Sequence, residues 1–329
     1  MTSSYHLGID LGGTNIKLAA ITDDGTVIER RTVPTEAHEG HDAVVQRMID
    51  NVLALREVVP TDAPVTSIGV AVPGVIDMDA GITKFLTNLP GHWPDVPVGP
   101  RIAEATGLPT FLINDVRAFT VAEHQIGAAK GVTTAICFAV GTGIGGGIVA
   151  NGKVNFGLGG AGGELGHIIV DPDGPRCNCG NRGCAEALAS GPAIVGEALR
   201  RIVQGATTSL RDLIDDDLNR MTPAIVERAA AEGDAVAIEI LETAGFYLGI
   251  AVASAIASLA PEVVIIGGGN VKPGGVFWRA IESTARAHSH VTDIDRIVFK
   301  PPALGYEAGV IGAALWGMQS VAARAGHGA

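Results

Sequence analysis

Aromatic residues make up only 4% of this 329-residue chain, and charged residues only 18%. Apolar residues nevertheless reach 47%, and glycine occurs 45 times. The cores are therefore expected to consist of aliphatic side chains, and many turns are expected to be tight. This composition favours an α/β protein, and the length is sufficient for two domains that each bury a substantial core.

Positive charge is also scarce, since 23 Lys and Arg residues stand against 35 Asp and Glu residues, for a net charge of −12. This balance argues against a nucleic-acid-binding surface and does nothing to attract an anionic membrane. The first residues contain no basic flank followed by a long apolar run, so we expect no signal peptide and a cytoplasmic location. The uncharged segment 243–260 approaches membrane-spanning length, but its Ala, Gly and Ser content favours a buried core helix.

The chain has only four cysteines, and three of them fall within residues 163–186, GELGHIIVDPDGPRCNCGNRGCAE. One imidazole and three thiolates can close a tetrahedral shell around zinc, and the predicted ligands are His167, Cys177, Cys179 and Cys184. A disulfide between Cys177 and Cys179 would be strained, because one residue separates them. Since four protein ligands leave no open position for water, we expect a structural zinc. The alternative is a loop of reduced thiols without metal.

Two glutamates, Glu164 and Glu186, bracket these ligands and would be held in place by the same metal. Ionised carboxylate oxygens accept hydrogen bonds from hydroxyl groups, so two fixed carboxylates beside the imidazole of His167 suit a polyhydroxylated ligand. The pattern therefore suggests a sugar-binding site.

A glycine-rich turn follows the first predicted strand, within a strand, turn and strand pattern at residues 6–21. Asp10 ends that strand, Gly12 and Gly13 let backbone amides approach an anion, and Thr14 adds a hydroxyl group. The alternative is an ordinary glycine hairpin. Beside a phosphate, Asp10 would need an intervening cation, and Mg²⁺ fits that position.

A second turn of this kind occurs in residues 133–151, where the turn residues are Gly141, Thr142 and Gly143. We interpret the two segments as a weak internal repeat whose turns hold the phosphate tail of a nucleotide. No acidic residue of the second segment corresponds to Asp10. The predicted strand at 262–270 ends in Gly267, Gly268 and Gly269, which would let a flat ligand lie against the backbone, although a plain turn explains them equally well.

A short apolar strand at 110–113 is followed by Asn114 and Asp115 and then by a predicted helix at 116–126. Open α/β sheets bind ligands at the carboxyl ends of their strands. We therefore predict that Asp115 is the general base that accepts a proton from a substrate hydroxyl as it attacks phosphorus. An N-cap of the helix is the structural alternative. Asn88, next to an indole in the loop NLPGHW, is a further candidate for contact with a sugar.

Together these motifs resemble the ROK family (repressor, open reading frame, kinase), especially its bacterial glucokinase-like sugar kinases. The resemblance rests on DLGGTNIK, VPG, IND and GTGIGGGI, and most strongly on ELGH followed by CNCGNRGCAE. It implies a two-domain α/β fold of the actin-like, hexokinase-type ATPase class (ribonuclease H-like), with an interdomain cleft. The expected domains are residues 1–118, completed by a C-terminal helix at 309–329, and residues 119–308 with the zinc-binding loop.

The resemblance also implies an ATP-dependent hexokinase that converts glucose to glucose 6-phosphate, with Asp115 as the base. Expected sugar contacts are Asn88, Asn114, Asp115, Glu164, His167 and Glu186. Expected nucleotide contacts are Asp10, Gly12, Gly13, Thr14, Lys17, Gly141, Thr142, Gly143, Gly267, Gly268 and Gly269. The implied cofactors are ATP, Mg²⁺ and structural Zn²⁺, the partners are a sugar and a nucleotide, and the assembly is a homodimer or homotetramer.

Kinases of N-acetylglucosamine and N-acetylmannosamine share all of these motifs, so the sequence leaves the sugar open, as well as the use of polyphosphate in place of ATP. A sugar-sensing regulator of the family would carry a DNA-binding helical domain before the first glycine turn, and we expect none because that turn begins at Asp10. Val116 and Arg117 stand where many members have Ala-Asn. Catalysis should survive this departure, while the edge of the pocket or the sugar preference could differ.

Overall fold

Two separate five-stranded sheets organise the chain. The computed structural model describes residues 4–327, which fall into two compact units. Unit 1 contains the chain up to Gly131, Val154–Gly162 and the chain from Ala303 onwards, and unit 2 contains Val132–Lys153 and Gly163–Pro302. The chain thus crosses between the units four times. The first crossing lies at residues 131 and 132, later than the predicted domain boundary at residue 118.

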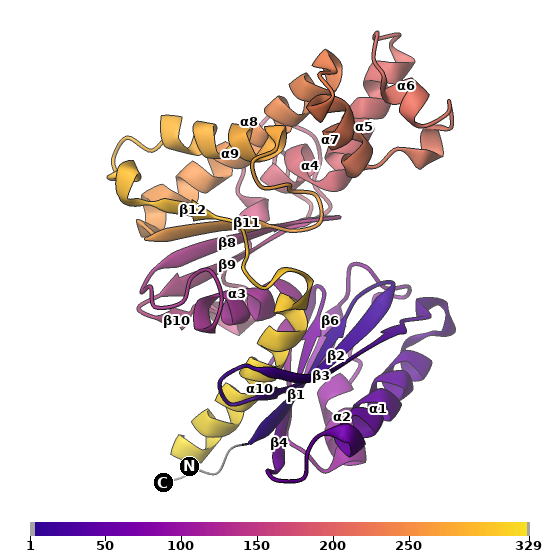
Figure 1. Cartoon of the computed structure of the whole chain (residues 1–329), viewed down its shortest axis with the longest axis vertical. Coiled ribbons are helices and arrows are strands. Elements are labelled where there is room, and N and C mark those ends of the chain that lie inside the picture. Colours follow the sequence, from indigo (N-terminus) through magenta and orange to yellow (C-terminus); the bar gives the residue numbers. More distant parts are fainter. Residues whose placement is uncertain (1–3, 328–329) are drawn as a thin grey trace. The chain divides into compact units, whose positions relative to one another are not determined.

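Unit 1 is built on a sheet with the strand order β3-β2-β1-β4-β7 (Figure 1). Its strands are β1 (Tyr5–Leu11), β2 (Asn15–Thr22), β3 (Val27–Pro34), β4 (Val65–Val72) and β7 (Thr110–Asn114). Strands β1, β2 and β3 pair antiparallel, whereas β4 is parallel to both β1 and β7. The carboxyl ends of β1, β4 and β7 therefore share one edge. A separate two-stranded sheet is formed by β5 (Val75–Asp77) and β6 (Ile82–Phe85).

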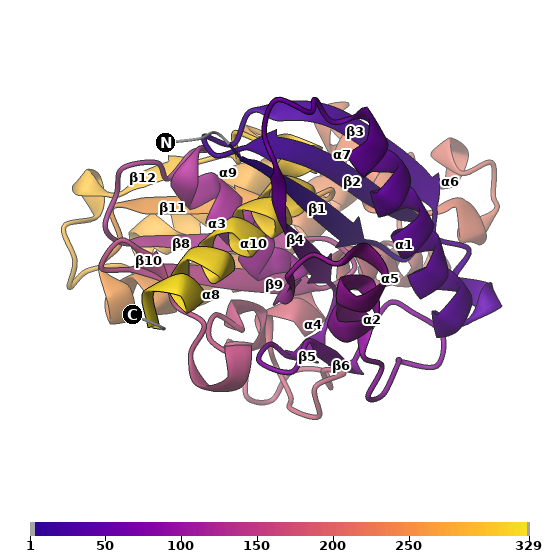
Figure 2. The ribbon, with the colours of Figure 1, turned by 90° about the horizontal axis from the view of Figure 1, so that it is seen from below.

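Helices cover both faces of this sheet. Helices α1 (His41–Val58) and α2 (Val98–Thr106) lie on one face, and α3 (Asp115–Gln125) and α10 (Ala308–His327) on the other (Figure 2). Alternate residues of a strand point to opposite faces, so Leu18 joins the core under α1 while Ala19 joins the core under α3 and α10. The packing of α3 against α10 explains why the first crossing follows this helix instead of dividing it.

Unit 2 contains a sheet with the strand order β10-β9-β8-β11-β12. Its strands are β8 (Ala135–Val140), β9 (Ile144–Ala150), β10 (Lys153–Val154), β11 (Val263–Gly267) and β12 (Val298–Lys300). Its helices are α4 (Ala185–Ala189), α5 (Gly191–Val203), α6 (Leu210–Leu213), α7 (Pro223–Ala231), α8 (Ala235–Leu259) and α9 (Val276–Ala287). The segment 210–218 is rich in charged residues, yet it contributes the buried side chains of Leu210 and Ile214 to the core.

Helix α8 is long and apolar enough to cross a membrane by length and composition, and 61% of its most apolar window is buried in the protein. It packs against α4, α5, α7 and α9. This burial agrees with the prediction of a core helix.

The two sheets share a central pattern. In each, a middle strand pairs antiparallel with the strand after a glycine turn and parallel with a later strand on its other side. The middle strand is β1 in unit 1, between β2 and β4, and β8 in unit 2, between β9 and β11. The internal repeat inferred from the glycine turns is thus present in the topology.

Candidate active site

Three of the predicted site residues of unit 1 lie at one edge of its sheet. Asp10 pairs in register with Ala71 of β4, and Ala71 pairs with Ile113 of β7, directly before Asn114 and Asp115. Because these strands are parallel, their carboxyl ends bring the two aspartates together. The two aspartates are about a hundred residues apart in the sequence, and the pairing of the strands brings them to the same edge of the sheet.

Asn114, and not Asp115, caps helix α3. The side-chain oxygen of Asn114 accepts hydrogen bonds from the amides of Val116 at 3.0 Å and Arg117 at 3.3 Å, and its side-chain nitrogen donates to the carbonyl of Gly74 at 3.1 Å. Asp115 Oδ1 accepts a hydrogen bond from the adjacent Val116 amide at 2.9 Å. The capping role considered for Asp115 therefore belongs to its neighbour, and the second oxygen of Asp115 is available for chemistry.

The surroundings of Asp115 raise the pKa of its carboxyl group to about 7. Burial is the main cause, and the negative charge of Asp10 adds to it, while the Val116 amide and the positive charge of Arg117 oppose the rise. Arg117 is itself only 2% exposed and donates to the Asn114 side chain at 3.2 Å. A carboxyl group with a pKa near neutrality is well matched to accept a proton from a substrate hydroxyl.

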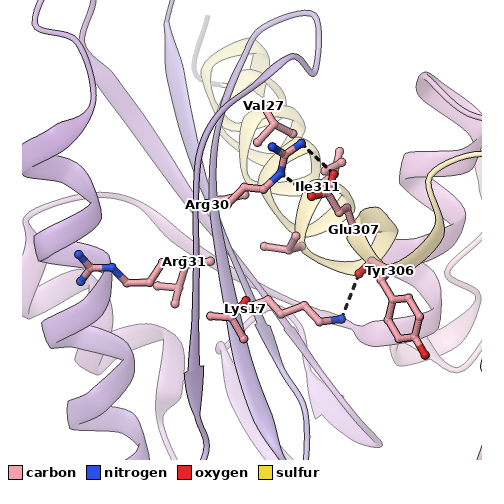
Figure 3. A pocket seen from close by; sticks show the side chains of 11 residues that line it. Lys17, Val27, Arg30, Arg31, Tyr306, Glu307 and Ile311 are labelled. Carbon is pink, nitrogen blue, oxygen red and sulfur yellow. Dashed lines mark hydrogen bonds and ion pairs between the residues drawn. The ribbon is translucent and has the colours of Figure 1, made fainter.

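Lys17 lies opposite Asp10 across the β1–β2 pair, with its Nζ atom 3.7 Å from Asp10 Oδ2. The same Nζ donates to the carbonyl of Tyr306 at 3.0 Å (Figure 3). A cavity of about 200 Å³ lies here, between β2, β3 and the start of α10, and Arg30 pairs with Glu307 at its rim. Burial raises the pKa of Asp10 and Lys17 lowers it. Lys17 thus favours the ionised form of Asp10 and joins it to the C-terminal segment.

The first glycine turn is held by hydrogen bonds from Thr35 and is exposed to solvent. Buried Thr35 donates from its backbone to the carbonyl of Thr14 at 2.8 Å and from its hydroxyl to the carbonyl of Gly12 at 2.7 Å. Gly13 and Thr14 are exposed, so an anion can reach this turn from solvent. Asn88 is also exposed, and its carbonyl oxygen lies against Gly13.

The second glycine turn is anchored at the carbonyl of Gly141. This oxygen accepts hydrogen bonds from the amide of Gly191 at 3.0 Å and from the side chain of Asn270 at 2.7 Å. The run Gly267 to Gly269 lies beside the turn, because Gly267 pairs with Ala139 at the end of β8. Asn270 was missed by sequence reasoning, although its position directly after three glycines at a strand end was a usable signal.

The four predicted metal ligands come together in unit 2, and their donor atoms lie within 4.8 Å of one another. His167 lies in a short 3₁₀ helix (Leu165–His167), and its Nδ1 is 3.6 Å from Cys177 Sγ. Cys179 Sγ is 3.7 Å from Cys184 Sγ, which is too far for a disulfide. Zinc bonded tetrahedrally to sulfur at about 2.3 Å would separate two sulfurs by about 3.8 Å, so the spacing and the donor set fit zinc.

The two glutamates beside the cysteines have different surroundings. Glu186, on α4, accepts the amide of Ile144 with Oε2 at 2.9 Å, and its Oε1 lies 3.6 Å from Cys177 Sγ. A side chain at Gly143 would collide with this carboxylate, so the turn passes close to it only because residue 143 is glycine. Glu164 Oε2 lies 3.9 Å from His167 Nε2, the nitrogen that faces away from the cysteines. Glu186 therefore connects the metal cluster to the second glycine turn, a link that sequence reasoning did not anticipate.

Comparison with known proteins places these residues in a family. The sequence profile described as the ROK family matches residues 6–320. The chain belongs to the ROK family. A glucokinase of Thermotoga maritima is 34% identical over 308 residues, which is 94% of this chain and 95% of that protein.

Two solved ROK structures are similar over almost the whole chain. The ROK hexokinase of Thermus thermophilus has a TM-score of 0.81 at 34% identity. The match covers 97% of this chain and 99% of the hexokinase chain. A ROK glucokinase from Streptomyces griseus, solved with glucose and AMPPNP, has a TM-score of 0.81 at 28% identity. The match covers 96% of this chain and 99% of the glucokinase chain. The predicted ROK membership, the actin-like, hexokinase-type α/β fold class and the enzyme class of sugar kinase are confirmed.

Proposed function

We propose that this ROK sugar kinase transfers the terminal phosphoryl group of ATP to the 6-hydroxyl of a free aldohexose, with glucose as the preferred substrate. The observation that carries the proposal is Asp115, a carboxyl group with a pKa of about 7 at the strand edge that also holds Asp10 and leads to the first glycine turn. A proton acceptor beside an anion-binding turn is what phosphoryl transfer to a hydroxyl requires.

In this proposal the free oxygen of Asp115 takes the proton of the 6-hydroxyl as that oxygen attacks phosphorus. The exposed amides around Gly13 and Thr14 contact phosphate oxygens, and the turn Gly141 to Gly143 does the same from unit 2. Gly267 to Gly269 would lie near adenosine. Asp10 would contact Mg²⁺ that arrives with ATP, and this cation would offset the negative charge on the phosphates. Lys17 opposes the rise in the pKa of Asp10 that burial causes, and so favours the ionised form that this contact needs.

We assign sugar binding to two groups of side chains, one in each unit. In unit 1 these are Asn88, Asn114 and Asp115, and in unit 2 they are Glu164, His167 and Glu186. Asn114 already uses its side chain to cap α3 and to bind Gly74, so its contact with a sugar would add to an existing network. The glucose complex of the related Streptomyces griseus glucokinase supports a hexose as the ligand class.

Zinc would be held by His167 Nδ1 and the three thiolates, which leaves His167 Nε2 and Glu164 directed away from the metal. The metal would fix the imidazole and the start of α4, and with it Glu186. Removal of zinc by a chelator is expected to raise the KM for sugar about tenfold with a smaller change in kcat, because substrate orientation and not chemistry is lost. Elemental analysis should find about one zinc per chain, and a metal-free preparation with an unchanged KM would refute this role.

A coupled phosphorylation assay tests the proposed substrate. Glucose, mannose, fructose, N-acetylglucosamine and N-acetylmannosamine are compared at equal concentration, each with ATP and with polyphosphate as the donor. The proposal expects the highest kcat/KM for glucose with ATP. A higher value for either N-acetyl sugar would assign the enzyme to the N-acetylhexosamine kinases instead. We further propose a cytoplasmic homodimer or homotetramer, which size-exclusion chromatography with light scattering would test.

A further inference from the structure

Glu123, near the end of α3, is a completely buried carboxylate, with 0% of its surface exposed. Its oxygens accept three backbone hydrogen bonds. The amide of Ala128 donates to Oε2 at 2.7 Å, the amide of Ala303 donates to Oε2 at 3.0 Å, and the amide of Leu304 donates to Oε1 at 2.9 Å. All four residues belong to unit 1.

These three amides lie where the chain leaves unit 1 and where it finally returns. Ala128 precedes the first crossing at residues 131 and 132, and Ala303 is the first residue after the last crossing. One side chain therefore holds segments that are 175 residues apart in sequence (303 minus 128). Both are fastened to the helix that begins with Asp115.

The approach of the outgoing segment to Glu123 is unusually close. A side chain at Gly127 would collide with Glu123 Oε2, and the amide of Ala129 donates to the Glu123 carbonyl at 2.9 Å. Glycine at 127 is therefore required for the carboxylate to reach the Ala128 amide. A negative charge in the last turn of a helix is unfavourable for the helix dipole, so the hydrogen bonds of Glu123 must outweigh that cost.

Unit 2 holds the other end of the outgoing segment by the same means. Glu262 Oε1 accepts the amide of Thr133 at 2.7 Å, the amide of Thr134 at 3.0 Å and the hydroxyl of Thr133 at 2.8 Å. Between the two carboxylates lie residues 129–132, which include Gly131 with a φ of 83°. On the return path, only Pro301 and Pro302 separate β12 from Ala303.

We propose that Glu123 is a positioning residue that fastens the first and last crossings to α3. Asp115, at the start of the same helix, then keeps its position when unit 2 moves. At these two crossings, bending is then left to residues 129–132 and 301–302, while the crossings at residues 153–154 and 162–163 are held by neither carboxylate. The inference rests on the proposed function in one respect, since it assigns to Glu123 the alignment of the two groups of substrate-binding side chains during sugar phosphorylation.

The test is Glu123→Gln, which keeps the shape of the side chain but replaces one of its two acceptor oxygens with an NH2 group. That group cannot accept a hydrogen bond from a backbone amide. Hydrogen exchange of the Ala128, Ala303 and Leu304 amides should accelerate about tenfold relative to the interior of α3, because a charged acceptor is lost. In the folded variant, kcat for glucose should fall and KM should rise together, with kcat/KM lower by about tenfold, as expected for hinge residues. The acidic limb of the pH profile should not move, because Asp115 keeps its surroundings.

Two further variants sharpen the test. Glu262→Gln is the matched control, because this carboxylate is exposed and holds only one crossing, and its effect on kcat/KM should be less than about threefold. Gly127→Ala displaces the Glu123 carboxylate without removing its charge and should reproduce the Glu123→Gln pattern, which keeps the inference testable if the latter fails to fold.

Unchanged exchange at the three amides, or wild-type kcat and KM in a Glu123 variant that is fully folded at the assay temperature, would overturn the inference. A variant that lowers only the melting temperature would show a purely structural residue and overturn it as well. If the wild-type protein phosphorylates none of the five sugars, the proposed function fails, and the exchange measurement alone then decides whether Glu123 holds the crossings.

Discussion

The two glycine turns have the same backbone plan and different electrostatic surroundings. The turn after β1 lies beside Asp10, Lys17 and, through the sheet, Asp115. The turn after β8 has no acidic residue on its own strands, and instead its Gly141 carbonyl is held by Asn270 and Gly191 while Glu186 binds the next amide from α4.

This difference indicates that the two turns have different roles. The partly buried carboxylate of Asp10 suits a phosphate that carries a cation. The carboxylate of Glu186 beside the second turn is bonded to the Ile144 amide, so this turn suits a phosphate or nucleotide that it binds through other backbone amides. Substitutions beside the first turn should therefore change the rate and its pH dependence, and substitutions that loosen the second turn should change nucleotide affinity.

The largest expected effect comes from Asp115→Asn, which removes the proposed base. We expect kcat to fall by about a thousandfold, within the range for general base catalysis, with the sugar dissociation constant changed less than about threefold. Steady-state kinetics and calorimetric titration with glucose measure the two quantities. Near-wild-type turnover would remove Asp115 from the mechanism.

The same variant should be more stable than the wild type at high pH. The pKa of Asp115 is about 7 in the folded state, against an ordinary value of 3.8, so the folded protein binds more protons than the unfolded protein between these values. Its contribution to stability therefore declines as pH rises from about 4 to about 7. Asp115→Asn should raise the melting temperature at pH 8 and leave it almost unchanged at pH 4. A lower melting temperature at pH 8 would contradict the assigned burial.

A smaller effect is expected from Asp10→Asn, which makes the first turn resemble the second. We expect kcat to fall by about a hundredfold, because the proposed contact with Mg²⁺ is weakened. The negative charge of Asp10 also raises the pKa of Asp115, so its removal should move the acidic limb of kcat/KM to lower pH. An acidic limb that stays in place would show that the two carboxylates do not interact.

The smallest effect is expected from Asn270→Ala, which removes the 2.7 Å hydrogen bond to Gly141. The KM for ATP should rise about fivefold, the value expected for one hydrogen bond, while the pH profile stays unchanged. Asn219→Ala is a suitable control, because that side chain is exposed and bonds only locally to Asp217 among the contacts described. An equal change in both variants would argue against a specific role for Asn270.

Local features of the site could be predicted well from the sequence. Glycine turns, an aspartate after a short apolar strand, and closely spaced cysteines each depend on a few adjacent residues. The fold class followed from motifs that extend over nearly the whole chain. Among the helices that the sequence did not indicate are α2, which begins after the irregular loop 86–97, and α9, which follows Lys272, Pro273 and two glycines.

Pairings between distant side chains could not be predicted in the same way. The sequence gives no reason why Asn114 and not Asp115 should cap α3, why Glu186 should reach the amide of Ile144, or why Glu123 should face Ala303. Each contact depends on which strands and helices become neighbours, and many arrangements of the same local patterns exist.

By itself the sequence determined the chemical groups that the protein has available: four candidate zinc ligands, two candidate anion-binding turns and a candidate base. Tertiary structure decided the state of those groups. The pKa of Asp115 rises because folding partly buries it and brings Asp10 near, and neither burial nor a neighbour across the sheet is a property of a residue in the unfolded chain.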